Sequence, residues 1–226
     1  MNMRRLQILS TIAALATLAV PAGAGPQNAS PQKPDHMQHR FDDPERFAKS
    51  FDDPERDQWQ MPGRVIEALA LRSDSTVADI GAGTGYFAMR LAKAVPKGMV
   101  YAVDVEPKML EFLRKRAQSE HAANVAPVQA AATSPNLPKP VDVILIVNTY
   151  HHLPGRETYF RELKRSLVSG GRIAIVDYRK DAPDGPPVEF RFEAAQIIDE
   201  MRQAGYRLEV QHDFLPRQHF LIFRPE

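Results

Sequence analysis

The sequence contains no cysteine among its 226 residues. This absence excludes disulfide bonds, a lipid-modified cysteine, thiolate metal ligands and a cysteine nucleophile. A large net charge is also missing, because 29 Lys and Arg residues oppose 28 Asp and Glu residues. Nucleic-acid binding requires a concentrated basic surface that neutralises phosphates. We therefore do not expect nucleic acid to be the main partner.

Long apolar runs are scarce, and the longest is LQILSTIAALATLAV at residues 6–20. The basic segment MNMRR precedes this run, and the small residues Ala22 and Ala24 follow it. This layout is typical of a secretory signal peptide, and the run is short for a membrane span. We expect residues 1–24 to direct export, to the periplasm of a bacterium, and to leave no membrane span after cleavage. The alternatives are an uncleaved anchor, or a cytoplasmic protein translated from Met37.

The segment 25–40 is polar and rich in proline, which indicates a flexible lead-in to the folded part. His36 and His39 are three residues apart in this segment, but no third ligand type lies nearby. We therefore predict no metal site.

A hexapeptide, FDDPER, occurs at residues 41–46 and again at residues 51–56. In each copy the second Asp can cap a helix, the Pro suits the first helical position, and Glu follows in the first turn. We expect residues 41–61 to form an arm of two short helices. One interpretation is a capped arm alone. The other is a lid that closes over a cofactor with its last three residues, Trp59 to Met61.

From residue 62 onward, strand-like and helix-like segments alternate. The predicted strands span 76–80, 99–105, 124–130, 141–150, 172–178, 206–215 and 218–224, and the predicted helices span 62–72, 86–95, 107–119, 156–168 and 188–205. Such alternation implies a doubly wound, mostly parallel sheet. The last two strands are close enough in sequence to pair as an antiparallel hairpin. We therefore predict one α/β domain over residues 62–226 with a seven-stranded sheet.

The stretch VADIGAGTGYF at residues 77–87 places a glycine-rich turn directly after a strand. Its G-x-G-x-G spacing departs from the dinucleotide fingerprint G-x-G-x-x-G, because Tyr86 occupies the sixth position, and the GK[ST] of a triphosphate site is missing. Asp79 lies two residues before the first glycine, where its carboxylate would repel a polyphosphate and attract a cation. The turn therefore favours a ligand with a positive group and a carboxylate that helix N–H groups can accept.

Two stretches carry a resemblance to a known family. VADIGAGTGYFAMRLAKAV resembles the first motif of class I S-adenosylmethionine-dependent methyltransferases, and VYAVDVEPKMLEFLRKRA is similar to the second. The resemblance covers roughly residues 62–180. It implies a Rossmann-like methyltransferase fold, S-adenosylmethionine as cofactor, and methyl transfer to an acceptor. The chain looks most similar to small-molecule methyltransferases and to exported bacterial methyltransferase-domain proteins.

The resemblance also implies the cofactor-binding residues. They are Asp79, Gly81, Ala82, Gly83, Thr84, Gly85, Asp104, Val105, Ala131 and Asn148. Asp104 is expected to accept hydrogen bonds from the ribose hydroxyls, and Val105 to lie beside the adenine. Many relatives carry an acid after the third strand for the adenine amino group, whereas this chain has only alanines at 130–132. Backbone groups are expected to serve there instead.

The candidate catalytic residues Tyr150, His151 and His152 follow the fourth strand, whose end faces the transferable methyl group in the family. Adjacent residues at a strand end point in different directions, so we expect one histidine to face the pocket. His151 is the preferred base or acceptor-positioning group, and His152 is the second choice. A structural hydrogen bond to a loop is the alternative role.

The pattern of the later elements predicts roles for four further residues. Asp177 and Tyr178 end the next strand and are predicted substrate contacts, with packing as the alternative. Arg191 and Glu193 are expected on a solvated helix face.

Two other functions remain open at this point. The first is an exported protein that binds S-adenosylmethionine or S-adenosylhomocysteine without catalysis, because a leader implies a compartment where the cofactor is not made. The second is a nicotinamide-dependent reductase, for which an acid 23 residues after Gly81 is also suitable. The glycine spacing and the missing Tyr-x-x-x-Lys pair count against the reductase.

Overall fold

A seven-stranded sheet forms the centre of residues 41–226, the part of the chain that the computed structural model describes. The strands are β1 (Thr76–Ile80), β2 (Met99–Asp104), β3 (Val125–Gln129), β4 (Val141–Val147), β5 (Leu167–Tyr178), β6 (Tyr206–His212) and β7 (Gln218–Pro225). Their order is β3-β2-β1-β4-β5-β7-β6. The first five strands pair in parallel, and β7 is antiparallel to both β5 and β6. The predicted Rossmann-like methyltransferase fold with a C-terminal antiparallel hairpin is confirmed.

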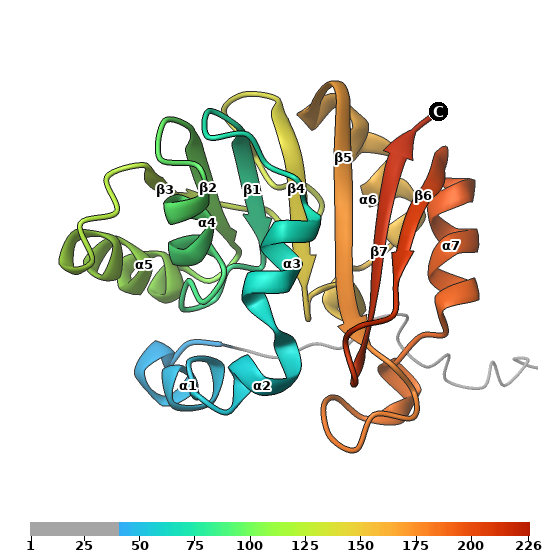
Figure 1. Ribbon diagram of the computed structural model, residues 1–226, viewed down its shortest axis with the longest axis horizontal. Coiled ribbons are helices and arrows are strands. Elements are labelled where there is room, and N and C mark those ends of the chain that lie inside the picture. Colours follow the sequence, from blue (N-terminus) through green and yellow to red (C-terminus); the bar gives the residue numbers. More distant parts are fainter. Residues whose placement is uncertain (1–40) are drawn as a thin grey trace, which may run out of the picture. The chain divides into compact units, whose positions relative to one another are not determined.

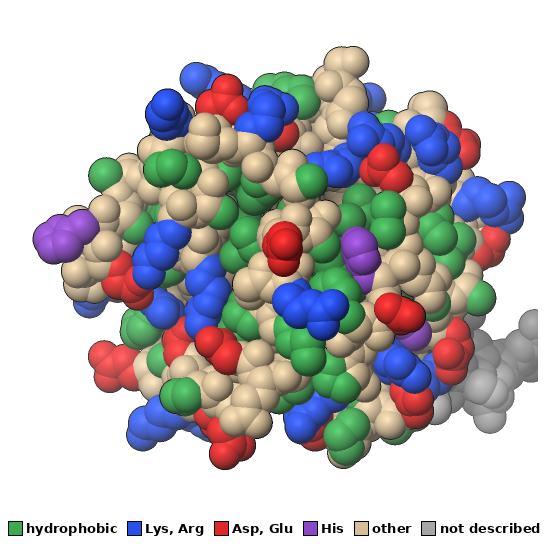
Figure 2. Space-filling view, viewed as in Figure 1, with side chains coloured by type: hydrophobic (Ala, Val, Ile, Leu, Met, Phe, Trp, Pro, Cys, Tyr) green, Lys and Arg blue, Asp and Glu red, His purple; other side chains and the backbone are tan. Residues whose placement is uncertain are grey.

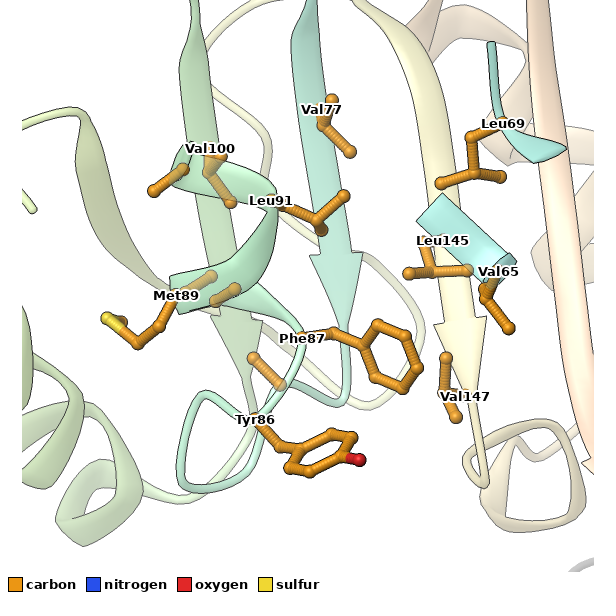
Figure 3. Close-up of a cluster of buried hydrophobic side chains, with 14 of the residues drawn as sticks. Val65, Leu69, Val77, Tyr86, Phe87, Met89, Leu91, Val100, Leu145 and Val147 are labelled. Atoms are coloured by element: carbon orange, nitrogen blue, oxygen red, sulfur yellow. The ribbon is translucent and has the colours of Figure 1, made fainter. Parts of the chain in front are cut away.

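Helices cover both faces of this sheet (Figure 1). The helices are α3 (Pro62–Ala68), α4 (Ala88–Ala94), α5 (Pro107–Ser119), α6 (Arg156–Leu163) and α7 (Ala194–Gln203). Apolar side chains of α3, α4 and α5 pack with one face of the sheet, and those of α6 and α7 pack with the other. Figure 3 shows the first of these clusters, in which Leu91 of α4 and Val65 of α3 lie over β1 and β4.

The alternation of side chains along β1 places an acid at one face of the sheet. Val77 belongs to the cluster beneath α3 and α4, whereas Ala78 and Ile80 belong to the cluster on the opposite face. Successive side chains in a strand point to opposite faces, so Asp79 lies on the same side as Val77. The strand thus brings a carboxylate to the start of α4.

The first FDDPER copy forms the predicted capped helix. Helix α1 (Pro44–Phe51) begins at its proline, and the side chain of Asp43 accepts a hydrogen bond from the Arg46 N–H at 3.1 Å. The second copy differs, because α2 (Arg56–Gln60) begins two residues after the proline. The Arg56 N–H donates to the Asp53 carbonyl at 2.9 Å, which closes a four-residue β-turn before the helix. The expectation of Pro54 at the first helical position was wrong for this reason.

Both arm helices lie beyond the carboxyl ends of the parallel strands (Figure 1). Asp52 pairs with Arg116 of α5 at 2.7 Å, and Asp57 pairs with Arg90 of α4 at 3.0 Å. The hydroxyl of Tyr86 donates a further hydrogen bond to Asp57. The arm is therefore fixed to the helices on either side of the glycine turn.

Several predicted boundaries were wrong. Helix α6 ends at Leu163 rather than at residue 168, and β5 begins at Leu167 rather than at residue 172. Gly170 has φ +77° and lies within β5, where the register with β4 shifts, so the Ser-Gly-Gly stretch accommodates an irregular strand. The last helix begins at Ala194 instead of residue 188. Arg191 precedes it and is buried, with its guanidinium donating to the Ala182 carbonyl at 2.7 Å, so the solvated position expected for Arg191 was wrong.

The surface shows no dominant charge on the face drawn in Figure 2, where basic and acidic side chains are interspersed. Over residues 41–226, no helix is both long and apolar enough to cross a membrane. The predicted signal peptide (1–24) and lead-in (25–40) lie outside the described residues.

Candidate active site

A cavity of about 750 Å³ lies at the carboxyl ends of β1, β2 and β4. In doubly wound sheets, ligands bind at this edge where the strand order reverses, and here the reversal lies between β1 and β4. The lining residues come from the arm, the glycine turn and the strand ends. They are Phe41, Phe51, Arg56, Asp79, Ile80, Gly81, Ala82, Gly83, Thr84, Tyr86, Phe87, Val103, Asp104, Val105, Met109, Ala130, Ala131, Ala132, Val147, Asn148, Thr149, His152, Leu153, Pro154 and Tyr159.

The glycine turn presents bare backbone to this cavity. Gly81 has φ +76° and Gly83 has φ +53°, conformations that L side chains rarely adopt. A Cβ atom on Gly81 would lie 2.1 Å from Thr149 Oγ1, and one on Gly83 would lie 3.3 Å from the Phe51 ring. Gly81 therefore requires glycine for conformation and for close approach, whereas glycine at position 83 avoids backbone strain and a tight contact with Phe51. Gly85 does not line the cavity, and its missing side chain instead admits Leu113 of α5.

Asp79 is the most unusual charged group of the site. Its side chain is 3% exposed, and its Oδ2 atom has no hydrogen-bond partner among the described residues. Burial raises the pKa of this carboxyl to about 7; the positive charge of Arg56 opposes this shift, and the negative charge of nearby Asp104 reinforces it. A buried carboxylate oxygen without a partner is costly, which indicates that a donor in the ligand completes the site.

Arg56 extends from the arm into the same cavity. Its guanidinium lies 3.9 Å from the centroid of the Tyr86 ring and donates to the Phe51 carbonyl at 2.6 Å. Burial lowers the pKa of this arginine from its usual value, and the charge of Asp79 acts in the opposite direction. The cavity wall thus carries a half-buried cation, Arg56, together with the buried carboxyl group of Asp79. This pair suits a zwitterionic amino-acid group, because the ammonium can meet Asp79 and the carboxylate can meet Arg56.

Asp104 ends β2 and holds the glycine turn in place. Its Oδ2 accepts a hydrogen bond from the Gly83 N–H at 2.9 Å, and its Oδ1 accepts one from the Glu106 N–H at 2.9 Å. Burial raises its pKa, whereas these two N–H groups lower it. Each carboxylate oxygen can accept a second hydrogen bond, so the position remains suitable for ligand hydroxyls.

The other predicted cofactor residues reach the cavity wall. Ala82, Thr84, Val105, Ala131 and Asn148 all line it. Val105 is 51% exposed, which leaves an apolar side chain at the wall for a flat ligand group. Thr84 Oγ1 is buried and, like Asp79 Oδ2, has no partner in the described part of the chain.

Of the three candidate catalytic residues, His152 lines the cavity and the other two do not. All three form a short 3₁₀ helix, η1 (Tyr150–His152). His152 lines the cavity, with its ring centroid 5.5 Å from that of Phe41. His151 is not among the lining residues, because it is 3% exposed and its Nδ1 lies 2.8 Å from Asp177 Oδ1. Tyr150 is also buried away from the cavity, and its hydroxyl donates to Glu200 of α7.

The predicted substrate contacts do not reach the cavity wall either. Asp177 is 2% exposed and bonds to His151, and the Tyr178 ring lies 5.9 Å from that of Trp59. Sequence reasoning missed Phe41, Phe51 and Arg56 as lining residues. The available signal was the repeat itself, because the two phenylalanines begin the two FDDPER copies and Arg56 ends the second.

No group of three or more His, Asp or Glu side chains within residues 41–226 is arranged to hold a metal ion.

Comparison with known proteins agrees with this geometry. Residues 77–171 match the family model described as a methyltransferase domain. The chain is 31% identical over 122 residues to 27-O-demethylrifamycin SV methyltransferase of Amycolatopsis mediterranei, which covers 53% of this chain and 44% of that protein. It is 32% identical over 120 residues to the ubiquinone/menaquinone biosynthesis C-methyltransferase of Pseudomonas fluorescens, covering 51% and 46%. The chain thus spans about half the length of these curated relatives.

One solved structure matches a larger share of this chain. The crystal structure of a SAM-dependent methyltransferase from Aquifex aeolicus has a TM-score of 0.74 and 28% identity, and the match covers 80% of this chain and 97% of that one. These matches are to methyltransferases, which counts against the alternative function of a nicotinamide-dependent reductase. Residues 77–171 therefore form a methyltransferase domain of the S-adenosylmethionine-dependent kind, and S-adenosylmethionine is the cofactor of this domain.

Proposed function

We propose that this protein transfers the methyl group of S-adenosylmethionine to a small-molecule acceptor. The observation that carries the proposal is Asp79 Oδ2, a buried oxygen without a described partner at the wall of a cavity that also holds Arg56. S-adenosylmethionine would supply a methyl group bound to a positively charged sulfur; attack of the acceptor's nucleophile on the methyl carbon, in line with the carbon–sulfur bond, would release S-adenosylhomocysteine. Asp79 accepts the ammonium of its amino-acid part, Arg56 faces the carboxylate, and Asp104 accepts ribose hydroxyls. The two relatives named above modify small molecules, which supports a small acceptor.

The protein's own contribution is alignment and the exclusion of water. Phe41, Phe51, Leu153 and Tyr159 give the cavity an apolar wall, so a small apolar or aromatic acceptor fits it. Holding two reactants in one orientation lowers the barrier by roughly 7–11 kcal/mol in favourable cases. A general base is needed only where the acceptor atom carries a proton.

His152 is the proposed base or acceptor-positioning group. We expect His152→Ala to lower turnover about 100-fold, the lower end of the range for general bases, while S-adenosylhomocysteine binds as in the wild type. The matched change His151→Ala is expected to act on folding instead, because it leaves the buried Asp177 carboxylate without its histidine partner. Steady-state kinetics, calorimetry and thermal unfolding of both variants distinguish the two roles. A loss of turnover in a stable His151→Ala protein, with His152→Ala unchanged, would reverse the assignment.

The arm over residues 41–61 is proposed to act as a lid. Its support is that Phe41, Phe51 and Arg56 line the cavity while Asp52 and Asp57 bind the two helices beside it. Hydrogen exchange of backbone amides tests this role. We expect amides of residues 44–60 to exchange more slowly when S-adenosylhomocysteine is added, and an unchanged rate would contradict the lid.

The function itself is tested by incubating purified protein with methyl-labelled S-adenosylmethionine and a panel of small phenols, amines and quinones. The expected result is label in one acceptor class together with release of S-adenosylhomocysteine. Tight binding of both cofactor forms without label in any acceptor would favour a binding protein that lacks catalysis.

Export remains part of the proposal, on the strength of the leader pattern in residues 1–24. Fractionation of cells expressing the full chain, compared with a chain that begins at residue 25, tests it. Processed protein in the periplasm only for the full chain is expected, and unprocessed protein in the cytoplasm would contradict export.

A further inference from the structure

Three side-chain amides and one arginine form a hydrogen-bonded chain from the arm to the cavity wall. Arg56 Nε donates to Gln60 Oε1 at 3.0 Å. Gln60 Nε2 donates to Gln218 Oε1, and Gln218 Nε2 donates to Asn148 Oδ1. Gln60 is 0% exposed and Gln218 is 2% exposed, so water does not compete for these groups. The chain joins α2, the start of β7 and the residue after β4.

The direction of this chain follows from chemistry rather than from the placement of each amide. A guanidinium has only N–H donors, so the atom of Gln60 that faces Arg56 must be its oxygen. Gln60 must then offer its NH₂ group to Gln218, which in turn must offer its own NH₂ group to Asn148. Arg56 thereby determines which end of the Asn148 amide faces the protein.

The remaining end of Asn148 faces the cavity as a donor. Asn148 lines the cavity, its Oδ1 is occupied by Gln218, and its Nδ2 donates to no described residue. Its backbone is also held, with φ +52° and an N–H bond to the Val176 carbonyl at 2.9 Å. Reversing this amide would place two NH₂ groups against each other, which is why its orientation is fixed.

We propose that Asn148 is a specificity-determining residue whose NH₂ group, oriented by Arg56 through Gln60 and Gln218, selects a ligand oxygen at the end of β4. The inference rests on the proposed function for the identity of the ligand. The selected group is a hydrogen-bond acceptor without a proton, such as a carboxylate, a carbonyl or a phenolate. It belongs either to the amino-acid part of the cofactor or to the methyl acceptor. An ammonium or other donor group is disfavoured at this point.

A substitution that lies far from Asn148 but reverses the direction of this series of hydrogen bonds tests the proposal. In Gln60→Glu the carboxylate accepts from Arg56 with one oxygen and requires a donor for the other, so Gln218 must turn its NH₂ group toward residue 60. Its oxygen then faces Asn148, whose NH₂ group turns away from the cavity. Gln218→Glu forces the same reversal from the middle of the chain and serves if the first variant does not fold. Gln60→Met has a similar size and no polar group, so it is the matched control that interrupts the series of hydrogen bonds without reversing its direction.

The readout is hydrogen exchange of the Asn148 side-chain NH₂ group in ligand-free, asparagine-¹⁵N-labelled protein. The sequence has five asparagines, and loss of one signal in Asn148→Ser identifies the resonance. We expect rapid exchange in the wild type and in Gln60→Met, and exchange slower by about tenfold in Gln60→Glu, as one new intramolecular hydrogen bond implies. Equal rates in wild type and Gln60→Glu, or slow exchange in the wild type, would overturn the proposal. Because no ligand is present, this result is independent of whether the protein is a methyltransferase.

A titration of the wild type then identifies the source of the oxygen. Slowed exchange of the Asn148 NH₂ group with S-adenosylhomocysteine alone assigns it to the cofactor carboxylate. Slowed exchange only after 4-nitrophenolate is added to that complex assigns it to the methyl acceptor. Unchanged exchange with both probes would contradict recognition of an oxygen by Asn148.

Discussion

Asp79→Asn should weaken binding of S-adenosylhomocysteine about 10- to 150-fold, because a hydrogen bond to a charged group contributes about 1.5–3 kcal/mol. The variant keeps the size of the side chain but removes the negative charge that faces the ligand ammonium. At pH 8 it should also unfold at a higher temperature than the wild type when no ligand is present. The reason is that the wild-type protein must bury an ionised carboxylate whose Oδ2 has no described partner.

The pH dependence of the wild type provides an independent check on Asp79. Its pKa is raised from 3.8 to about 7 in the folded protein, so the native state keeps a proton that the unfolded chain loses. The contribution of Asp79 to the free energy of unfolding is therefore largest below pH 4 and is lost as the pH rises toward 7. Binding shows the opposite trend, because the ligand ammonium needs the ionised form. Affinity for S-adenosylhomocysteine should rise about tenfold between pH 6 and pH 8.

Calorimetry at several pH values and thermal unfolding measure both effects. In Asp79→Asn, the Asp79 contribution to the pH dependence of binding and of stability should disappear. If the variant bound S-adenosylhomocysteine as tightly as the wild type, the role of the buried carboxylate would be refuted.

Gly81→Ala should destabilise the protein by at least about 3 kcal/mol, which places it among the large effects of single substitutions. The left-handed backbone at φ +76° accounts for about 1–2 kcal/mol of this loss in a residue with a Cβ atom. The rest comes from contact with Thr149, whose Oγ1 would lie 2.1 Å from the added atom. Denaturant unfolding of the wild type and variant measures the difference.

Two further variants separate these causes. Gly63→Ala is the matched control, because its Cβ atom would meet nothing within 4 Å, and we expect a stabilisation of about 0.5–1 kcal/mol within α3. Thr149→Ala in the Gly81→Ala background removes the closest atoms and should recover part of the lost stability. Equal stability of the wild type and Gly81→Ala would show that the turn does not approach Thr149 as described.

Much of the fold follows from local patterns in the sequence. The alternation of apolar residues predicts the strands, and Pro107 and Asp43 lie at helix starts because each suits the chemistry of a first helical turn. The glycine turn and Asp104 reach the cavity as expected, because both lie at strand ends on the edge where parallel strands finish.

The catalytic side of the cavity was harder to predict because it depends on contacts between distant segments. If the strand continued to residue 150 as predicted, the side chains of Tyr150, His151 and His152 would point alternately to opposite faces of the sheet. Instead, β4 ends at Val147 and a 3₁₀ turn follows. That turn directs His151 toward Asp177 and leaves His152 at the cavity. The hydrogen bond between Gln60 and Gln218 joins residues that are 158 positions apart in the sequence, and no local pattern reveals such a pairing.

Titration calorimetry with S-adenosylhomocysteine and with NADH, in parallel at pH 8, tests the central claim most directly. The claim is that a buried carboxylate beside the glycine turn selects a cationic amino-acid ligand over a pyrophosphate. We predict micromolar or tighter binding of S-adenosylhomocysteine and no measurable heat from NADH. Binding of NADH by a protein that ignores S-adenosylhomocysteine would contradict the account.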